Sequence, residues 1–246
     1  MHYKHNYLSK VIFQANFSID ALKRSIHPSI VDLCKELTGV EKVEQPIITL
    51  VLSMDKPGGS SERLPSYVFD GVRFQVRIQH GELVISDKQY THHEEFHGVI
   101  IKILSQLNLV YAKPSFSRVA LRYANNIKFE EGDTFDFNEK INPTLLGSTL
   151  DFKDFDLSRS IGIMNMHCDD IYVNFTYGFL NPEFPNKITK REFVLDFDCF
   201  KTPNVNIPDI QETLLELRAK VNILFEKSVL PELKQKMEPI NIPDGQ

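Results

Sequence analysis

Alternation of apolar and polar residues with a period of two is the feature that most limits how this chain can fold. In the segment 10–19, every second residue is apolar and most residues between them are polar. Successive side chains of a β-strand point to opposite faces, so this pattern predicts a strand with one buried and one polar face. The same alternation returns in the segments 72–85, 171–177 and 193–199.

Three further segments repeat their apolar residues every three to four positions, which predicts amphipathic helices. The first covers 28–37, where a proline suits the first turn and Gly39 suits the stop. The second covers 92–109. The third is the longest, from Asp209 to about Leu230, and Pro231 is expected to end or kink it.

These elements fall into two runs of similar order, each reading strand, helix, strand, hairpin and helix. We expect them as half-repeats over 8–110 and 115–238. Hairpins pair strands antiparallel, and helices that alternate with groups of strands are typical of α+β proteins. We therefore predict one α+β domain, 1–246, whose antiparallel sheet is closed by the long C-terminal helix. The segment 55–66 predicts a flexible loop, and 238–246 a frayed tail.

Charge and cysteine content narrow the classes of function. The formal net charge is −5, and no run of Lys and Arg stands out, which argues against a nucleic-acid binder. The three cysteines are far apart and form no CxxC motif, so we expect reduced thiols rather than disulfides or a zinc site. No apolar stretch approaches the ~20 residues of a membrane span. We expect a soluble, cytoplasmic protein without a cofactor.

Three segments carry a resemblance to a known family. They are LSKVIFQANF at 8–17, RVALRYANNI at 118–127, and FVLDFDCF at 193–200, which precedes the long helix. In this order and spacing they resemble a sporadically distributed bacterial protein family of unknown function. The resemblance implies an association with mobile elements, and hence with defence or toxin-related operons. It implies no catalytic residues.

The segment His93-Glu-Glu-Phe-His97 matches the HExxH pattern of zinc hydrolases. Two histidines four apart share one face of a helix and could bind a metal, with Glu94 as the base. A catalytic zinc needs a third protein ligand, and the next ~30 residues contain no His, Asp or Glu. The acidic residues also suit a first helical turn. We therefore interpret the motif as a polar helix start, with a metal site at His93 and His97 as the alternative.

Charged side chains repeat at even spacing on several predicted strands, which places them on shared faces. Asp196 and Asp198 form an acidic pair that could hold a cation or a ligand, or could pair with basic residues across strands. The basic residues at even spacing are Arg73 with Arg77, and Arg118 with Arg122. If these groups line one groove, they are the best candidate for a binding site.

Tyr123 and Asn125 follow Arg122 on the same predicted strand, and we include them among the candidate binding residues. A buried amide must find hydrogen-bond partners. Asn125 could therefore anchor the following loop, or it could recognise a ligand.

The sequence contains no complete catalytic constellation. We therefore expect a non-enzymatic interaction or regulatory protein that binds a partner protein, a small ligand or a second copy of the chain. The first alternative is a metal-dependent hydrolase that uses His93, Glu94 and His97, or Asp196 and Asp198. The second alternative is nucleic-acid binding through a groove formed by the four arginines.

Overall fold

The fold is built on one antiparallel eight-stranded sheet with the order β5-β6-β7-β2-β8-β11-β10-β9. The computed structural model describes residues 2–17, 26–41, 49–53, 60–64, 66–79, 81–111, 115–202 and 205–240. The strands of the sheet are β2 (Leu8–Phe17), β5 (Tyr67–Asp70), β6 (Phe74–Gln79), β7 (Glu82–Asp87), β8 (Phe116–Lys128), β9 (Ser160–Cys168), β10 (Ile171–Phe179) and β11 (Glu192–Lys201). The predicted α+β class is confirmed.

Two smaller sheets and five α-helices complete the described elements. One small sheet pairs β1 (His2–Tyr3) with β12 (Pro239–Ile240), and the other pairs β3 (Thr49–Ser53) with β4 (Ser60–Leu64). The helices are α1 (Pro28–Thr38), α2 (His93–Val110), α3 (Pro143–Leu146), α4 (Ile210–Ser228) and α5 (Pro231–Lys236), with short 3-10 turns η2 (Gly147–Thr149) and η3 (Ile207–Asp209). None of these helices combines the length and the apolar character that crossing a bilayer requires.

The order of the elements repeats along the chain. The first run, β2-α1-β5-β6-β7-α2, gives the sheet order β2-β7-β6-β5. The second run, β8-α3-β9-β10-β11-α4, gives β8-β11-β10-β9. In each run the later strands pair as hairpins, and the last strand lies beside the first. The β3–β4 pair is present only in the first run, and a duplication of the two halves stays a prediction.

The chain separates into two compact units. Unit 1 comprises Met1–Ser9, Arg122–Cys199 and Leu217–Gln246. Unit 2 comprises Lys10–Leu121 and Phe200–Glu216. The elements β2, β8, β11 and α4 contribute residues to both units. The prediction of a single domain therefore stays a prediction.

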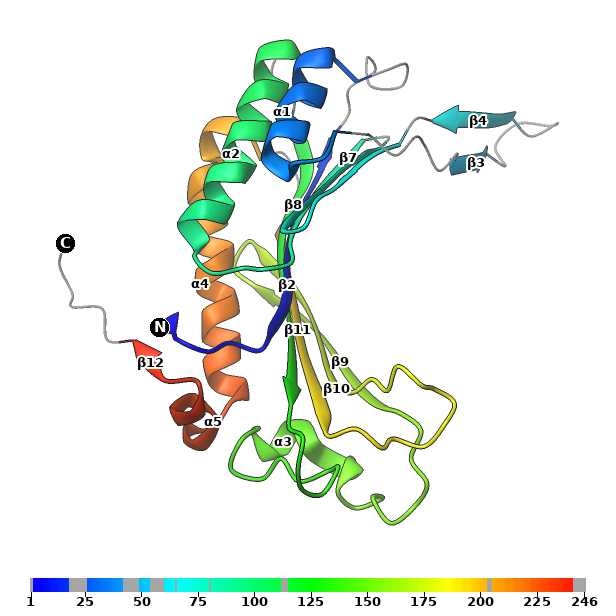
Figure 1. Cartoon of the computed structure of the whole chain (residues 1–246), viewed down its shortest axis with the longest axis vertical. Helices are drawn as coiled ribbons and strands as arrows, with labels where there is room; N and C mark the ends of the chain where they lie inside the picture. The colour runs from blue at the N-terminus through cyan, green and yellow to red at the C-terminus, as the bar shows by residue number, and fades with distance from the viewer. Residues whose placement is uncertain are drawn as a thin grey trace. The chain divides into compact units, whose positions relative to one another are not determined.

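Unit 2 buries the apolar faces of its strands under two helices. Figure 1 shows α1 and α2 on one side of β2 and β7. The odd-numbered residues of β2, from Val11 to Phe17, are buried, as the alternation predicts. The helix α1 follows its predicted signals: a proline occupies its first turn, and Gly39 takes the left-handed conformation (φ 70°) while its N–H donates to the carbonyl of Lys35.

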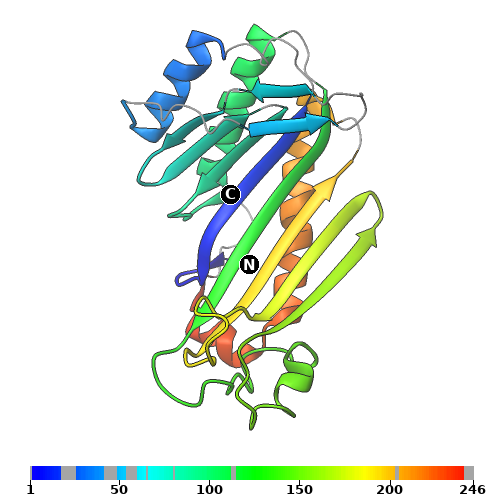
Figure 2. The same ribbon diagram turned by 90° about the vertical axis from the view of Figure 1, so that its right-hand side faces the viewer.

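Unit 1 buries alternate residues of two strands in the same way: Ile171, Val173 and Phe175 of β10, and Phe193, Leu195, Phe197 and Cys199 of β11. In Figures 1 and 2, α4 lies on one side of these strands. Phe137, Phe179 and Phe193 form a cluster whose ring centroids are 5.1–5.6 Å apart. The long helix ends at Ser228 and α5 begins at Pro231, so the proline ends α4, as predicted. Asp209, the predicted first residue of the long helix, instead closes the 3-10 turn η3, and α4 begins at Ile210.

Two segments predicted to lack regular structure are only partly described. Within 55–66, residues 60–64 form β4, whereas 55–59 and 65 lie outside the described residues. In the tail 238–246, Pro239 and Ile240 pair with β1, whereas 241–246 lie outside the described residues. The apolar run 47–54 contains β3, whereas 47, 48 and 54 lie outside the described residues.

Candidate binding face

The even-numbered residues of β11 mark a sheet surface that the helices of unit 1 leave uncovered. Along β11, Phe193, Leu195, Phe197 and Cys199 are buried, and the residues between them are partly exposed. Figure 2 looks onto this uncovered surface, with α4 behind the strands. We call it the open face of unit 1 and define it by five residues: Arg122 of β8, Asp196 and Asp198 of β11, and Tyr172 and Asn174 of β10.

Arg122 and Asp196 form a two-pronged ion pair across β8 and β11. Nε of Arg122 donates to Oδ1 of Asp196 at 2.8 Å, and its Nη2 donates to Oδ2. The Asp196 side chain is 14% exposed and the Arg122 side chain 46%. The hydrogen bonds from Asp196, and its charge together with that of Asp198, raise the pKa of Arg122 above its ordinary value. The pair therefore holds a permanently charged guanidinium in one orientation.

The rest of the open face adds an amide and an aromatic ring to this pair. Nδ2 of Asn174 lies 3.3 Å from Oδ2 of Asp198. Tyr172 stacks on His167 of β9, with ring centroids 4.3 Å apart and an interplanar angle of 15°. Tyr172 remains 38% exposed. The sequence interpretation missed both β10 residues, although the alternation of 171–177 already places them on the polar face of their strand.

Tyr123 and Asn125 lie on the opposite side of β8 from Arg122. They are 7% and 5% exposed. Nδ2 of Asn125 donates to the carbonyl of Leu195 at 3.2 Å. Asn125 therefore ties β8 to β11 in the covered layer, and the structure does not bring these two residues to the open face.

Arg118 belongs to unit 2, where it contacts β2 and the end of β11. Its Nη1 donates to Oε1 of Gln14 at 2.8 Å. Its guanidinium lies 4.4 Å from the ring centroid of Phe200, a cation–π contact.

Arg73 and Arg77, predicted to share a face, bind carboxylates on opposite faces of β7. Arg77 pairs with Glu82 at 3.1 Å, whereas Arg73 pairs with Asp87 at 3.2 Å. Glu82 and Asp87 are five residues apart on one strand, so their side chains point in opposite directions. The cause is local: Arg73 lies in the bend before β6, where strand alternation does not apply.

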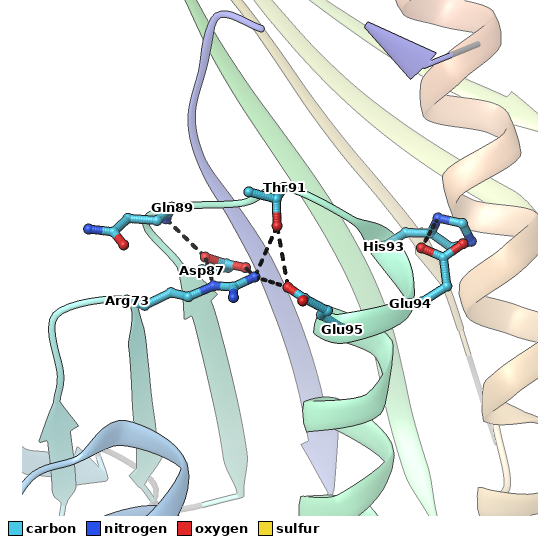
Figure 3. Close-up of polar contacts among 7 residues, drawn as sticks. All are labelled: Arg73, Asp87, Gln89, Thr91, His93, Glu94 and Glu95. Atoms are coloured by element: carbon cyan, nitrogen blue, oxygen red, sulfur yellow. Dashed lines mark hydrogen bonds and ion pairs between the residues drawn. The ribbon is translucent and has the colours of Figure 1, made fainter. Parts of the chain in front are cut away.

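Figure 3 shows the group around Arg73 at the start of α2. The guanidinium reaches Asp87, whose side chain is fully buried, and Glu95 at 2.6 Å. The backbone N–H of Gln89 also donates to Asp87 at 2.9 Å. Hydrogen bonds and charge from Arg73 lower the pKa of Glu95. This group fastens the end of β7 to the first turn of α2.

The two histidines of the HExxH motif lie at the start of α2, as predicted. Their rings meet edge to face with centroids 5.5 Å apart. Nδ1 of His93 lies 3.1 Å from Oε2 of Glu94, and Figure 3 shows these two side chains apart from the Arg73 group. Within the described ranges, no three His, Cys, Asp or Glu side chains are grouped to hold a metal ion. A metal at His93 and His97 stays a prediction.

No protein-family model matches this chain, and no curated protein matches it either. The family resemblance of the three segments therefore stays a prediction.

Proposed function

We propose that this protein is a non-enzymatic interaction protein that binds a partner protein through the open face of unit 1. The observation that carries the proposal is the grouping of Arg122, Tyr172 and Asn174 on a sheet surface that none of the described helices of the unit covers. Arginine and tyrosine are the residues that most often dominate the binding energy of protein interfaces.

The ion pair with Asp196 gives Arg122 a further property of a good contact residue. A flexible arginine loses side-chain entropy when a partner immobilises it, at a cost of about 0.5–1.5 kcal/mol. Arg122 is already held by two hydrogen bonds. The stack with His167 orients Tyr172 in the same way. A partner would therefore meet a preorganised surface.

The ion pairs also favour a protein over a nucleic acid as the partner. Phosphate groups gain most from cations whose charge is not yet compensated. Arg73, Arg77 and Arg122 each bind a carboxylate. A phosphate at Arg122 would have to displace Asp196, whereas a protein could add amide and aromatic contacts beside the intact pair.

The test is affinity capture from the native host with the wild-type chain and two variants. Asn174→Lys places a cation on the open face, and Tyr172→Ala removes its exposed ring. Lys187→Glu is the control, because Lys187 forms an exposed ion pair with Asp156 outside the strands of unit 1. The product of a neighbouring gene in a defence or toxin-related operon is the first candidate partner, which follows from the resemblance.

We expect a saturable complex of fixed stoichiometry that both face variants weaken at least about tenfold, equal to ~1.4 kcal/mol. The control should bind as the wild type does. Recovery of no stoichiometric partner, or equal binding by Asn174→Lys, would refute the proposal.

A further inference from the structure

The outer edge of β9 has the properties of a strand that pairs with another chain. β9 ends the eight-stranded sheet, and no described strand pairs with its outer edge. It runs for nine residues, SIGIMNMHC, in unbroken register with β10. A sheet edge normally avoids association through lysine, proline, a bulge or a short length. β9 contains no charged residue and no proline, and its register has no bulge.

The other end of the sheet shows such protection. β5 has only four residues. Its last residue, Asp70, binds Nζ of Lys88 at 2.6 Å and Nε2 of Gln75 at 2.8 Å. A short strand that ends in a charged network is a poor template for a new strand. The contrast singles out β9.

The turn between β9 and β10 determines which backbone groups face outward. Asp169 and Asp170 form a two-residue hairpin loop, with φ 57° at Asp169. The residues flanking such a loop, Cys168 and Ile171, bond to each other, and bonded pairs then alternate along the ladder. The N–H and C=O groups that point away from β10 are therefore those of Ile161, Ile163, Asn165 and His167.

A contact between β9 and β10 holds β9 firmly in place. Gly162 lies beneath the ring of Tyr177, and a Cβ at this position would collide with that ring. An aromatic side chain over a glycine stabilises an edge strand and its register. On the opposite face of the strand, Ile163 is 68% exposed. The edge therefore combines an ordered backbone with exposed apolar surface.

We propose that a second copy of this chain pairs with β9 to form a symmetric antiparallel dimer. Pairing about a two-fold axis at Met164 places Ile163 opposite Asn165 and Ile161 opposite His167 of the second copy. All the outward backbone groups then find partners, which gives about eight interchain bonds. Two chains with a net charge of −5 repel elsewhere, but this strand brings no charge to the contact.

A second copy is the favoured partner for the edge of β9 because it carries the same strand. An unlike partner would need its own free edge of matching length, whereas a second copy supplies one with the same register. A strand pair alone buries less surface than a standard interface, so we expect a dissociation constant of about 1–100 μM.

Sedimentation equilibrium tests this dimer, with Asn165→Pro as the main variant. The substitution removes one outward N–H, and Asn165 has no backbone bond to β10 in this register, so β9 itself should survive. Ile163→Lys is the second variant, because an edge lysine opposes strand addition. Asn174→Lys is the matched control, since it adds the same charge to the neighbouring strand.

We expect the wild-type mass to double with concentration, and both edge variants to raise the dissociation constant at least about tenfold. Asn174→Lys should dimerise normally while it loses the partner of the open face. Asn174→Lys therefore separates dimerisation from partner binding, so failure of one proposal is distinguishable from failure of the other. A monomer at every concentration up to about 500 μM, or a dimer unaffected by both edge variants, overturns the inference.

A cysteine at the two-fold axis gives an independent readout. Residues directly opposite in an antiparallel pair have Cβ atoms about 4.5–5.5 Å apart, within reach of a disulfide after slight adjustment. In a Cys168→Ser background, Met164→Cys should form a covalent dimer under mild oxidation, because Cys34 and Cys199 are buried. Asn174→Cys in the same background should not. Equal crosslinking of the two variants contradicts pairing through β9.

Discussion

Nη2 of Arg73 lies 3.2 Å from Oδ2 of Asp87, a carboxylate with no solvent exposure. Removing one partner of a buried ion pair leaves an uncompensated charge, which costs about 3–5 kcal/mol when both groups are buried. The Arg73 side chain is 30% exposed, so water would compensate part of the loss. The pair therefore holds the bend before β6 to the end of β7 more strongly than a surface pair could, and the second contact of Arg73, with Glu95, reaches α2.

We expect Arg73→Ala to lower the free energy of unfolding by roughly 2 kcal/mol, measured by urea denaturation. Arg77→Ala is the control, because both members of its pair with Glu82 keep some solvent exposure, 44% for Arg77 and 18% for Glu82, unlike Asp87. Its loss should cost less than about 1 kcal/mol. Equal losses for the two variants would contradict the role given to buried Asp87.

The Arg122–Asp196 pair should show measurable coupling. In a double-mutant cycle with alanine at both positions, we expect an interaction free energy of about 1 kcal/mol, because the contact is two-pronged and Asp196 is largely buried. The exposed pair of Lys187 with Asp156 serves as the reference cycle, and its coupling should be near zero. A coupling at Arg122–Asp196 no larger than this reference would show that the pair is not preorganised.

Two buried thiols predict how stability depends on alkaline pH. Burial raises the pKa of Cys34 to about 12 and, with the nearby charge of Asp198, that of Cys199 to about 12. The ordinary thiol pKa is ~8.5, so the unfolded chain loses these protons first. The stability from the two thiols is present below that value and is lost as the pH rises toward 12.

Each thiol should lower the free energy of unfolding by about 1.4 kcal/mol per pH unit over this range. Urea denaturation between pH 8 and about 11 measures the slope. A Cys34→Ala, Cys199→Ala variant controls for tyrosines, and its slope should be smaller by the thiol contribution. Identical slopes would exclude protonated, buried thiols as the cause.

Elemental analysis of protein purified without a histidine tag tests the HExxH motif. We expect less than about half an equivalent of zinc or nickel, since a tight zinc site requires at least a third protein ligand. His97→Ala is the control for metal bound adventitiously at these rings. One full equivalent that disappears in His97→Ala would favour the alternative of a metal-dependent hydrolase over the interaction protein.

The alternation of side chains along the strands predicts which residues of the candidate site share a face. Asp196 and Asp198 are two residues apart on one strand, which predicts that they share a face. The even spacing of Arg118 and Arg122 makes the same prediction for these two arginines. The same alternation already places Tyr123 and Asn125 on the face of β8 opposite to Arg122, where the structure buries them. The face to which Arg73 points depends on the bend before β6, which the alternation of apolar and polar residues does not reveal.

The amino-acid sequence by itself determined the α+β class, the faces of its strands and the stops of its helices. Side-chain periodicity and the backbone preferences of Pro and Gly act within a few residues. Only the tertiary structure decided that Arg122 meets Asp196, that Arg73 meets Asp87, and that β9 ends the sheet. These features depend on which distant segments pair and in what register, and contacts between residues far apart in the chain determine that choice.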